Sequence, residues 1–299
     1  MKSNIGLKWE ITGLTFNKAI DYDEDFIYNK LLLYRGLSHM LKLAANINYL
    51  FTELPFLERF SAAAENGFTG IEILMPYEYR PEEVSSILQM NNLECVLINT
   101  PYGDMFGGHT GLGAISGREK EFYEDANRAL DYAVKIDCRR IHALAGIPEK
   151  DMDFVMCREI FITNLRVMAE LALDREITIL IEPLNVFDFP GYFLTSQEQA
   201  QSILIDVGMP NVALQMDFYH CQIMEGDLTS KFNRFQKYIG HIQIAGVPGR
   251  NEPFIGEINY PYILEMIESS DFSGWVGAEY IPKETTTGGL HWAKSYGIK

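Results

Sequence analysis

Short apolar runs alternate with amphipathic segments along most of this chain. Eight of the runs are five or six residues long and nearly continuous in apolar character, as expected of parallel strands that are buried on both faces. They are Leu43–Ile47, Gly70–Leu74, Cys95–Thr100, Arg140–Ala145, Thr178–Pro183, Val212–Asp217, His241–Ala245 and Val276–Tyr280. The pattern therefore predicts the eight strands of a parallel sheet.

Helical patterns fill most of the gaps between these runs. Phe56–Asn66 carries its apolar residues on one face and stops at Gly67, a residue suited to the position just after a helix. Pro81 is typical of a first helical turn, and Glu82 and Glu83 favour the positive end of the helix dipole. The other predicted helices are Arg118–Ile136, Phe154–Leu173, Ser196–Val207, Ser230–Tyr238 and Pro261–Ser269.

Strands that each precede a helix predict a (β/α)8 barrel, the TIM-barrel class of α/β fold. A doubly wound open sheet is the alternative. It would more typically carry a Gly-rich phosphate turn after its first strand, and the segment ANINYLF has none. With 299 residues, 47% of them hydrophobic, the chain is long enough for one barrel domain with an ample core.

Residues 1–39 differ in character from the rest of the chain. They have no clear helical or alternating period apart from the brief apolar run Leu31–Tyr34, and Met40 then opens the first predicted strand. One interpretation is an N-terminal extension, or a start codon assigned too early with Met40 as the functional start. The other is an ordered arm used in packing or oligomerisation. We expect residues 40–299 to form the barrel domain.

The charge and cysteine content restrict the partners. A net charge of −16 argues against a nucleic-acid or anionic-membrane surface, because both need clustered Lys and Arg. It does not exclude a small anionic substrate. Cys95, Cys138, Cys157 and Cys221 form no C-x-x-C pair, which predicts reduced thiols in a cytoplasmic protein. The chain has no membrane-spanning run and no secretory signal pattern, and a homo-oligomer stays open.

Four oxygen-bearing side chains lie at or near the ends of the last four predicted strands: Glu182, Asp217, Gln243 and Glu279. A carboxylate inside an apolar strand is costly unless it is paired or bound to a metal. Neighbouring strands lie about 4.8 Å apart, so side chains at their carboxyl ends can converge on one ion. Such an all-oxygen set favours Mg²⁺ or Mn²⁺ over Zn²⁺. The alternative is that one or two of them are satisfied by hydrogen bonds or Arg pairs.

Two further residues join this set. His220 follows Asp217 by three positions, where it can orient a substrate oxygen or simply be a hydrogen-bonded histidine at a strand-to-helix turn. Arg250 lies in the polar loop after the seventh strand, and an Arg there can form a bidentate pair with a carboxylate or phosphate. Its alternative role is a partner for Glu252 or Glu257.

Other polar positions carry weaker predictions. Asn185 and Asp188 are expected to be turn residues, with hydrogen bonding to the site residues as the alternative. His142 is expected to be a core histidine, and His241 a residue that faces the helices. The long Gly-rich loop Thr100–Gly113 is expected to be a lid or rim, because it lacks the pattern of a phosphate loop. Five aromatic residues after the early strands either wall a substrate pocket or pack: Tyr49, Phe51, Tyr77, Tyr79 and Tyr102.

A series of motifs from Met40 to the C-terminus matches a known family. The motifs are ELPFLERF, GFTGIEILMPYEY, ISGREKEF, IEPLNVFDFPGYFLT, QMDFYHCQIMEGDLT, GHIQIA, RNEPFIGEINY, and GWVGAEYIP with a following TTTGGLHW. By these motifs the chain closely resembles the hydroxypyruvate isomerase family of xylose-isomerase-like barrels. Residues 1–39 have no counterpart in this pattern.

The resemblance implies a barrel that binds one divalent ion, with Glu182 and Glu279 as the catalytic acid/base pair. It also implies that His220 and Arg250 contact the substrate. Related sugar epimerases hold their metal with Glu, Asp, His and Glu, and Gln243 stands where their His would be. With a glutamine at this position, the chain resembles the isomerase branch of these barrels.

The expected reaction is the interconversion of hydroxypyruvate and 2-hydroxy-3-oxopropanoate, two small anionic hydroxy-oxo acids, through an enediolate. The segment AGVPGRNEPFIGEINYP resembles a relative that acts on 2-oxo-tetronates, so the substrate stays open, and a ketose 3-epimerase is a further alternative. An endonuclease of the related repair fold would need a His-rich centre and a basic groove, which six histidines and the net charge disfavour. A non-catalytic metal-binding barrel is the remaining alternative.

Overall fold

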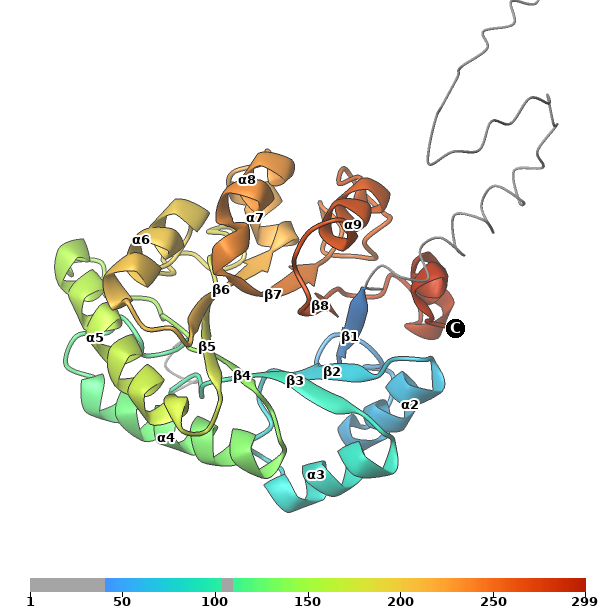
Figure 1. Ribbon diagram of the computed structural model, residues 1–299, viewed down its shortest axis with the longest axis horizontal. Helices are drawn as coiled ribbons and strands as arrows, with labels where there is room; N and C mark the ends of the chain where they lie inside the picture. Colours follow the sequence, from blue (N-terminus) through green and yellow to red (C-terminus); the bar gives the residue numbers. More distant parts are fainter. Residues whose placement is uncertain (1–40, 104–109) are drawn as a thin grey trace, which may run out of the picture. The chain divides into compact units, whose positions relative to one another are not determined.

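Eight parallel strands close into a barrel in the order in which they occur along the chain (Figure 1). The computed structural model describes residues 41–103 and 110–299, so the predicted N-terminal extension lies outside the described residues. The strands are β1 (Lys42–Asn46), β2 (Gly70–Ile73), β3 (Glu94–Asn99), β4 (Arg140–His142), β5 (Thr178–Ile181), β6 (Val212–Asp217), β7 (Ile239–Ile244) and β8 (Trp275–Ala278). The predicted TIM barrel is confirmed.

Helices form a ring outside these strands (Figure 1). The α-helices of the described residues are α2 (Arg59–Glu65), α3 (Pro81–Met90), α4 (Glu119–Lys135), α5 (Phe154–Leu173), α6 (Gln197–Val207), α7 (Phe218–Met224), α8 (Leu228–Phe235) and α9 (Tyr260–Glu268). Short 3₁₀ segments cover Phe56–Glu58, Gln236–Tyr238 and Thr287–Tyr296.

The helix ends follow the capping residues in the sequence. The side chain of Asp153 accepts a hydrogen bond of 2.9 Å from the Val155 N–H at the start of α5. Ser196 caps α6 in the same way through the Gln199 N–H, and α6 ends at Gly208, whose left-handed φ of 67° suits glycine. The predicted helix Phe154–Leu173 therefore matches α5 residue for residue.

The sequence pattern did not predict two elements, α7 and the 3₁₀ segment over Thr287–Tyr296. The helix α7 starts directly after Asp217, where a turn was expected, and its residues from Phe218 to Cys221 are all buried. A helix of 7 residues that is buried over its first turn has no amphipathic period to detect. Because α7 starts directly after β6, His220 lies close to Asp217 at the end of that strand.

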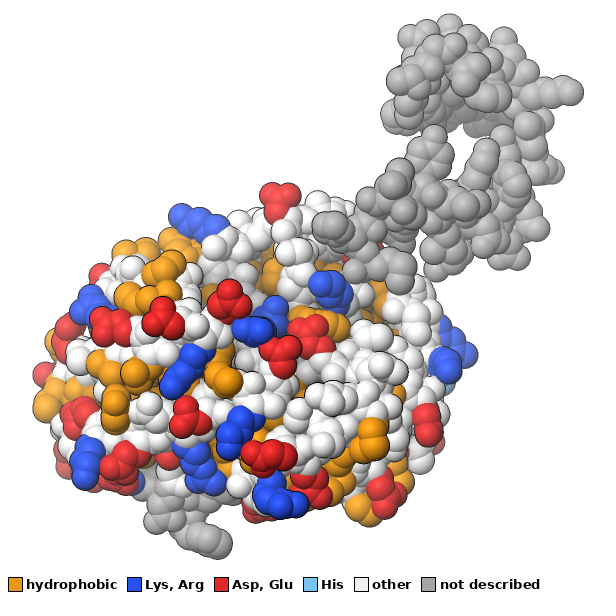
Figure 2. All heavy atoms as spheres, turned by 60° about the horizontal axis from the view of Figure 1, so that its bottom comes forward, with side chains coloured by type: hydrophobic (Ala, Val, Ile, Leu, Met, Phe, Trp, Pro, Cys, Tyr) orange, Lys and Arg blue, Asp and Glu red, His pale blue; other side chains and the backbone are white. Residues whose placement is uncertain are grey.

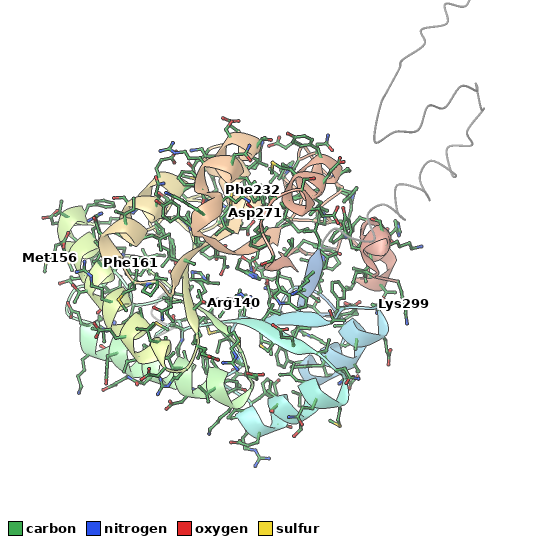
Figure 3. All side chains as sticks on the ribbon, in the orientation of Figure 1. Arg140, Met156, Phe161, Phe232, Asp271 and Lys299 are labelled. Atoms are coloured by element: carbon green, nitrogen blue, oxygen red, sulfur yellow. The ribbon has the colours of Figure 1, made fainter. Side chains whose placement is uncertain are left out.

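The inside of the barrel is divided into an apolar and a polar layer. Ala44, Leu180 and Trp275 belong to a small apolar cluster, and side chains two to four positions further along the same strands are polar. The polar layer near the carboxyl ends of the strands contains Asn46, Glu72, Gln215, His241 and Gln243, each at most 1% exposed. In Figure 3, side chains fill the space enclosed by the strands, and Arg140 on β4 lies near its centre.

The surface of the barrel domain carries both charged and apolar side chains. On the face shown in Figure 2, acidic and basic side chains are interspersed among apolar ones. All four cysteines are buried, unpaired thiols. Within residues 41–103 and 110–299, every helix is too short or too polar to cross a membrane.

Candidate active site

The four predicted oxygen ligands come together at the carboxyl ends of the strands. Glu182 follows β5, Asp217 ends β6, Gln243 lies in β7 and Glu279 follows β8. The register of β6 and β7 pairs Asp217 with Gln243, so these two residues are direct neighbours. All four side chains are buried, at most 5% exposed. The barrel therefore concentrates three carboxyl groups and one amide in a buried space.

Two carboxylate oxygens in this set are free to bind a metal ion. Glu182 Oε1 and Asp217 Oδ2 are buried and have no hydrogen-bond partner among the described residues. One carboxylate oxygen of Glu182 and one of Asp217 lie within 4.8 Å of each other, which is a spacing that one ion can bridge. Buried carboxylate oxygens without partners are costly, and a divalent cation would compensate them. The donor set thus fits an oxygen-preferring cation.

Gln243 is held with its oxygen directed toward this cluster. Its Nε2 donates a 2.9 Å hydrogen bond to Glu72 Oε2, and its Oε1 accepts one of 2.6 Å from Gln215 Nε2. Gln215 Nε2 also donates to Glu182 Oε2 at 2.8 Å. An amide oxygen has two lone pairs, so Gln243 Oε1 retains one for a cation.

His220 has one defined tautomer. Its Nδ1 faces two donors from Asn185, the backbone N–H at 3.1 Å and the side-chain Nδ2 at 2.8 Å. The Asn185 amide cannot turn around, because its Oδ1 accepts the N–H groups of Phe187 and Asp188 and its Nδ2 donates to Asp188 Oδ2. Nδ1 is therefore an acceptor, and the proton lies on Nε2.

This tautomer decides the role of His220 in the cluster. A nitrogen that carries a proton has no lone pair for a metal, so Nε2, at 3.7 Å from Asp217 Oδ2, is a hydrogen-bond donor and not a ligand. Burial, and then the positive charge of Arg250, hold the pKa of His220 well below its usual range, so the ring is neutral. Asn185, expected to be a turn residue, both forms the turn and orients His220.

Arg250 forms an ion pair with Glu279 rather than with Glu252 or Glu257. Its guanidinium lies between the rings of Tyr49 and Tyr219, at 4.8 and 5.0 Å from their centres, and 3.8 Å from Asp217 Oδ2. The two rings hold the guanidinium plane in place. The guanidinium of Arg250 is thus held between the carboxylates of Glu279 and Asp217.

Burial and mutual repulsion act on all three carboxyl groups. Burial raises the pKa of Glu279 to about 8 and that of Asp217 to about 6, although Arg250 opposes both shifts. Burial also raises the pKa of Glu182 well above its usual value, with the charges of Glu279 and Asp217 adding to the effect. Glu279 and Asp217 can therefore hold or release a proton near neutral pH.

The described residues enclose a cavity of about 60 Å³ above this cluster. Its walls include Glu182, Glu279, His220 and Arg250, together with Gln215. Among the early aromatic residues, Tyr49 and Tyr102 line the cavity, whereas Phe51 packs in the core and Tyr77 bonds the backbone of Asn99. Residues 104–109 of the predicted lid lie outside the described part of the chain.

The prediction for His241 was wrong, whereas that for His142 is confirmed as far as its burial goes. His241 does not face the helices but points into the barrel, where its Nε2 lies 2.5 Å from Glu72 Oε1. A shift in the register of β6 and β7 next to Gln215 accompanies this inward orientation. His142 is buried as predicted, but it lines the cavity, with its Nδ1 at 3.3 Å from Glu182 Oε2. Burial lowers the pKa of His142 to about 3, so it is neutral there.

Several residues of the site escaped the sequence prediction, above all Glu72, Gln215 and Asn46. Glu72 lies in the apolar run GIEILM on β2, so the rule that identified the carboxylates of the later strands applied equally to it. Asn46 and Gln215 are neutral amides, which are less unusual inside a strand and give a weaker signal.

The raised pKa values predict how pH and a cation act on stability. In the folded protein, Asp217 and Glu279 keep protons that the unfolded chain has already released. The contribution of these two groups to the free energy of unfolding of the metal-free protein therefore falls as pH rises from about 4 to about 8, whereas the lowered pKa values of His142 and His220 act in the opposite direction below about pH 6.5. We expect Mn²⁺ to raise Tm more at about pH 7.5 than at about pH 5.5, because protons compete with the cation. Calorimetry with EDTA and with Mn²⁺ checks this, and equal increases at both pH values would contradict it.

The fold and site together define a class of proteins. The family described as xylose isomerase-like TIM barrel matches residues 60–296, and the chain belongs to this family. The chain is 45% identical to a 2-oxo-tetronate isomerase of Cupriavidus necator over 86% of its own length and 99% of the relative. It is 43% identical to the hydroxypyruvate isomerase of Escherichia coli over 86% of this chain and 100% of that one. The protein is an isomerase of this group.

Solved structures of other proteins have the same fold. A Brucella melitensis protein described as an AP endonuclease of family 2 is 46% identical and superposes with a TM-score of 0.85, over 86% of this chain and 100% of that one. A D-psicose 3-epimerase of Clostridium cellulolyticum superposes with a TM-score of 0.69 at 19% identity, over 81% of this chain and 85% of that one. The second similarity shows the shared fold alone.

Proposed function

We propose that this protein interconverts hydroxypyruvate and 2-hydroxy-3-oxopropanoate with the help of one divalent cation. The observation that carries the proposal is the pair of buried carboxyl groups, Glu182 and Glu279, which line one small cavity together with Arg250. A sugar-acid isomerase needs two proton carriers and an anchor for the substrate carboxylate, and these residue types supply both. Relatives named for this reaction and for a neighbouring one support the assignment.

The reaction moves one proton from C3 to C2 of the substrate. One carboxylate takes the C3 proton and leaves an enediolate, and a carboxyl group returns a proton to C2, while the hydroxyl proton passes between the two oxygens. Glu182 and Glu279 are the proposed carriers because both have raised pKa values and face the cavity. The Nε2–H of His220 is the proposed donor to a substrate oxygen.

Mg²⁺ or Mn²⁺ is the proposed cofactor, held by Glu182, Asp217, Gln243 and Glu279. When bound, it would supply Lewis-acid stabilisation of the negative charge that develops on the substrate oxygens. The unpartnered oxygens of Glu182 and Asp217 support this ligand set. The cytoplasm is the proposed compartment, supported by the four free thiols.

Arg250 is proposed to bind the substrate carboxylate. We expect Arg250→Ala to raise KM for hydroxypyruvate about 10- to 100-fold, since a hydrogen bond to a charged group contributes about 1.5–3 kcal/mol. Turnover of dihydroxyacetone, in which a CH₂OH group replaces the carboxylate, should change much less. Initial rates with the two substrates check the role, and equal losses on both would remove it.

A 2-oxo-tetronate isomerase is the second candidate, favoured by the relative from Cupriavidus necator. The test is a screen of purified protein with Mn²⁺ or Mg²⁺ against hydroxypyruvate, 2-oxo-tetronates and neutral ketoses, with products followed by proton NMR. Conversion of tetronates or ketoses without conversion of hydroxypyruvate would overturn the proposed substrate.

A further inference from the structure

A continuous set of hydrogen bonds connects the two proposed proton carriers beneath the cavity. From Glu182 it passes through the amides of Gln215 and Gln243 to Glu72, and then through the amide of Asn46 to Glu279 Oε1. These side chains come from β1, β2, β6 and β7 and from the segments just after β5 and β8. The arrangement makes Glu72 the point at which the two halves of the network meet.

The burial of the Glu72 carboxylate at this place costs free energy. Its side chain is fully buried, and among the described residues its ion-pair partner is His241 rather than a Lys or Arg. An apolar residue of similar size would avoid the cost of burying a carboxylate. Strand β8, separated from β2 by β1, also makes room for it, because a Cβ on Gly277 would lie 1.8 Å from Glu72 Oε1. The fold thus accommodates a costly group, and packing alone does not account for it.

The carboxylate determines the direction of every hydrogen bond around it. An ionised carboxylate only accepts, so each partner must present an N–H group. Glu72 Oε2 accepts from Asn46 Nδ2 and from Gln243 Nε2, both at 2.9 Å. The Nε2 end of Gln243 is therefore turned toward Glu72, and its oxygen is turned the other way, toward Gln215 and Glu182.

We propose that Glu72 is a positioning residue for the cation site, which fixes the Gln243 amide so that its oxygen is presented as a ligand. The inference rests on the cation site of the proposed function, and it concerns the ligand geometry rather than the substrate. A carboxylate at position 72 leaves Gln243 one favourable orientation. A neutral amide at that position offers both a donor and an acceptor, so the amide of Gln243 can turn its nitrogen toward the cation.

The first test measures Mn²⁺ affinity of the Glu72→Gln protein by isothermal titration calorimetry. The expected result is a Kd about 10- to 100-fold higher than that of the wild type, the range typical of groups that orient metal ligands. Glu252→Gln is the matched control, because Glu252 is also buried and bonds the backbone N–H of Lys283 outside the cavity. Its Mn²⁺ affinity should remain that of the wild type. An unchanged Kd in Glu72→Gln would overturn the proposal.

A second test separates orientation from simple loss of charge. In a Gln243→Glu background, position 243 presents an oxygen whichever way it turns. If Glu72 acts by orientation, Glu72→Gln should raise Kd for Mn²⁺ less than about threefold in this background, so the two changes are strongly non-additive. If Glu72 contributes only its negative charge, the fold-change is the same in both backgrounds, and the positioning role is overturned.

Glu72→Asp keeps the charge but withdraws it by one methylene group, so it provides an independent variant. The positioning role predicts weakened Mn²⁺ binding here as well, whereas wild-type affinity would overturn it. These measurements use binding alone, so they are separate from the proposed reaction. A wild-type protein that binds Mn²⁺ through a Glu72-dependent site but does not convert hydroxypyruvate supports this inference and overturns only the proposed substrate. Wild-type protein that binds no Mn²⁺ overturns the inference.

Discussion

Glu182→Gln and Glu279→Gln are each expected to lower kcat for hydroxypyruvate by about 10³-fold or more, near the upper part of the range for general acid–base groups. Each substitution keeps the shape of the side chain but removes its ability to carry a proton. Both carboxyl groups are buried in the same cavity, where bulk water cannot replace them efficiently. The measurement is the rate of product formation by NMR with saturating Mn²⁺, so that weakened cation binding does not limit the rate.

Exchange of the substrate C3 proton in D₂O divides the two roles between the glutamates. The variant that has lost the base should show neither exchange nor product. The variant that has lost the acid should still exchange C3 hydrogen for deuterium while forming little product. Glu252→Gln serves again as the buried control and should retain wild-type kcat. Near-wild-type turnover in either glutamate variant would remove that residue from the proton transfer.

Asp217→Asn is expected to weaken Mn²⁺ binding by more than about 100-fold, beyond the 10- to 100-fold effect of residues that only orient ligands. The two oxygens of Asp217 have separate tasks. Oδ1 accepts a 2.7 Å hydrogen bond from the Tyr219 N–H at the start of α7, whereas Oδ2 has no hydrogen-bond partner among the described residues. Asparagine keeps the capping oxygen and places a nitrogen where the cation ligand should be.

Asp217→Ala distinguishes the two tasks. It should lose Mn²⁺ binding as Asp217→Asn does, but it should also lower the free energy of unfolding in EDTA by a further amount of about 1 kcal/mol for the lost cap. Asp153→Asn, at the cap of α5, is the control and should change neither quantity appreciably. Retention of tight Mn²⁺ binding in Asp217→Asn would show that this carboxylate is not a ligand.

The strands and most helices were predictable because their signals are local. A strand buried on both faces must be apolar along its length, and α5 begins directly after its capping residue Asp153. The helix α7 was not predictable, because its buried first turn removes the polar face that reveals a surface helix. The orientation of His241 was not predictable either. Its side chain points inward next to a register shift between β6 and β7, and no local sequence pattern shows such a shift.

The candidate site was predictable in part. Glu182, Asp217 and Glu279 stood out because a carboxylate is rare within an apolar strand, and Gln243 because it occupies the corresponding place on β7. Glu72 carried the same signal but lay on an early strand, away from the run of consecutive candidates. For Asn185 the sequence left a turn residue and a hydrogen-bonding residue of the site as alternatives, because a turn-forming asparagine looks alike whether or not its other atoms bind a histidine.

The sequence by itself determined which residue types could serve the chemistry and that a barrel would bring the strand ends together. Only the tertiary structure decided how they are oriented: the proton of His220 on Nε2, the Gln243 oxygen facing the carboxylates, and Arg250 paired with Glu279. The physical reason is that residue identity sets what a group can donate or accept, whereas direction is set by partners distant in the chain. Glu72 and Gln243 are 171 residues apart, and their contact exists only once the barrel closes.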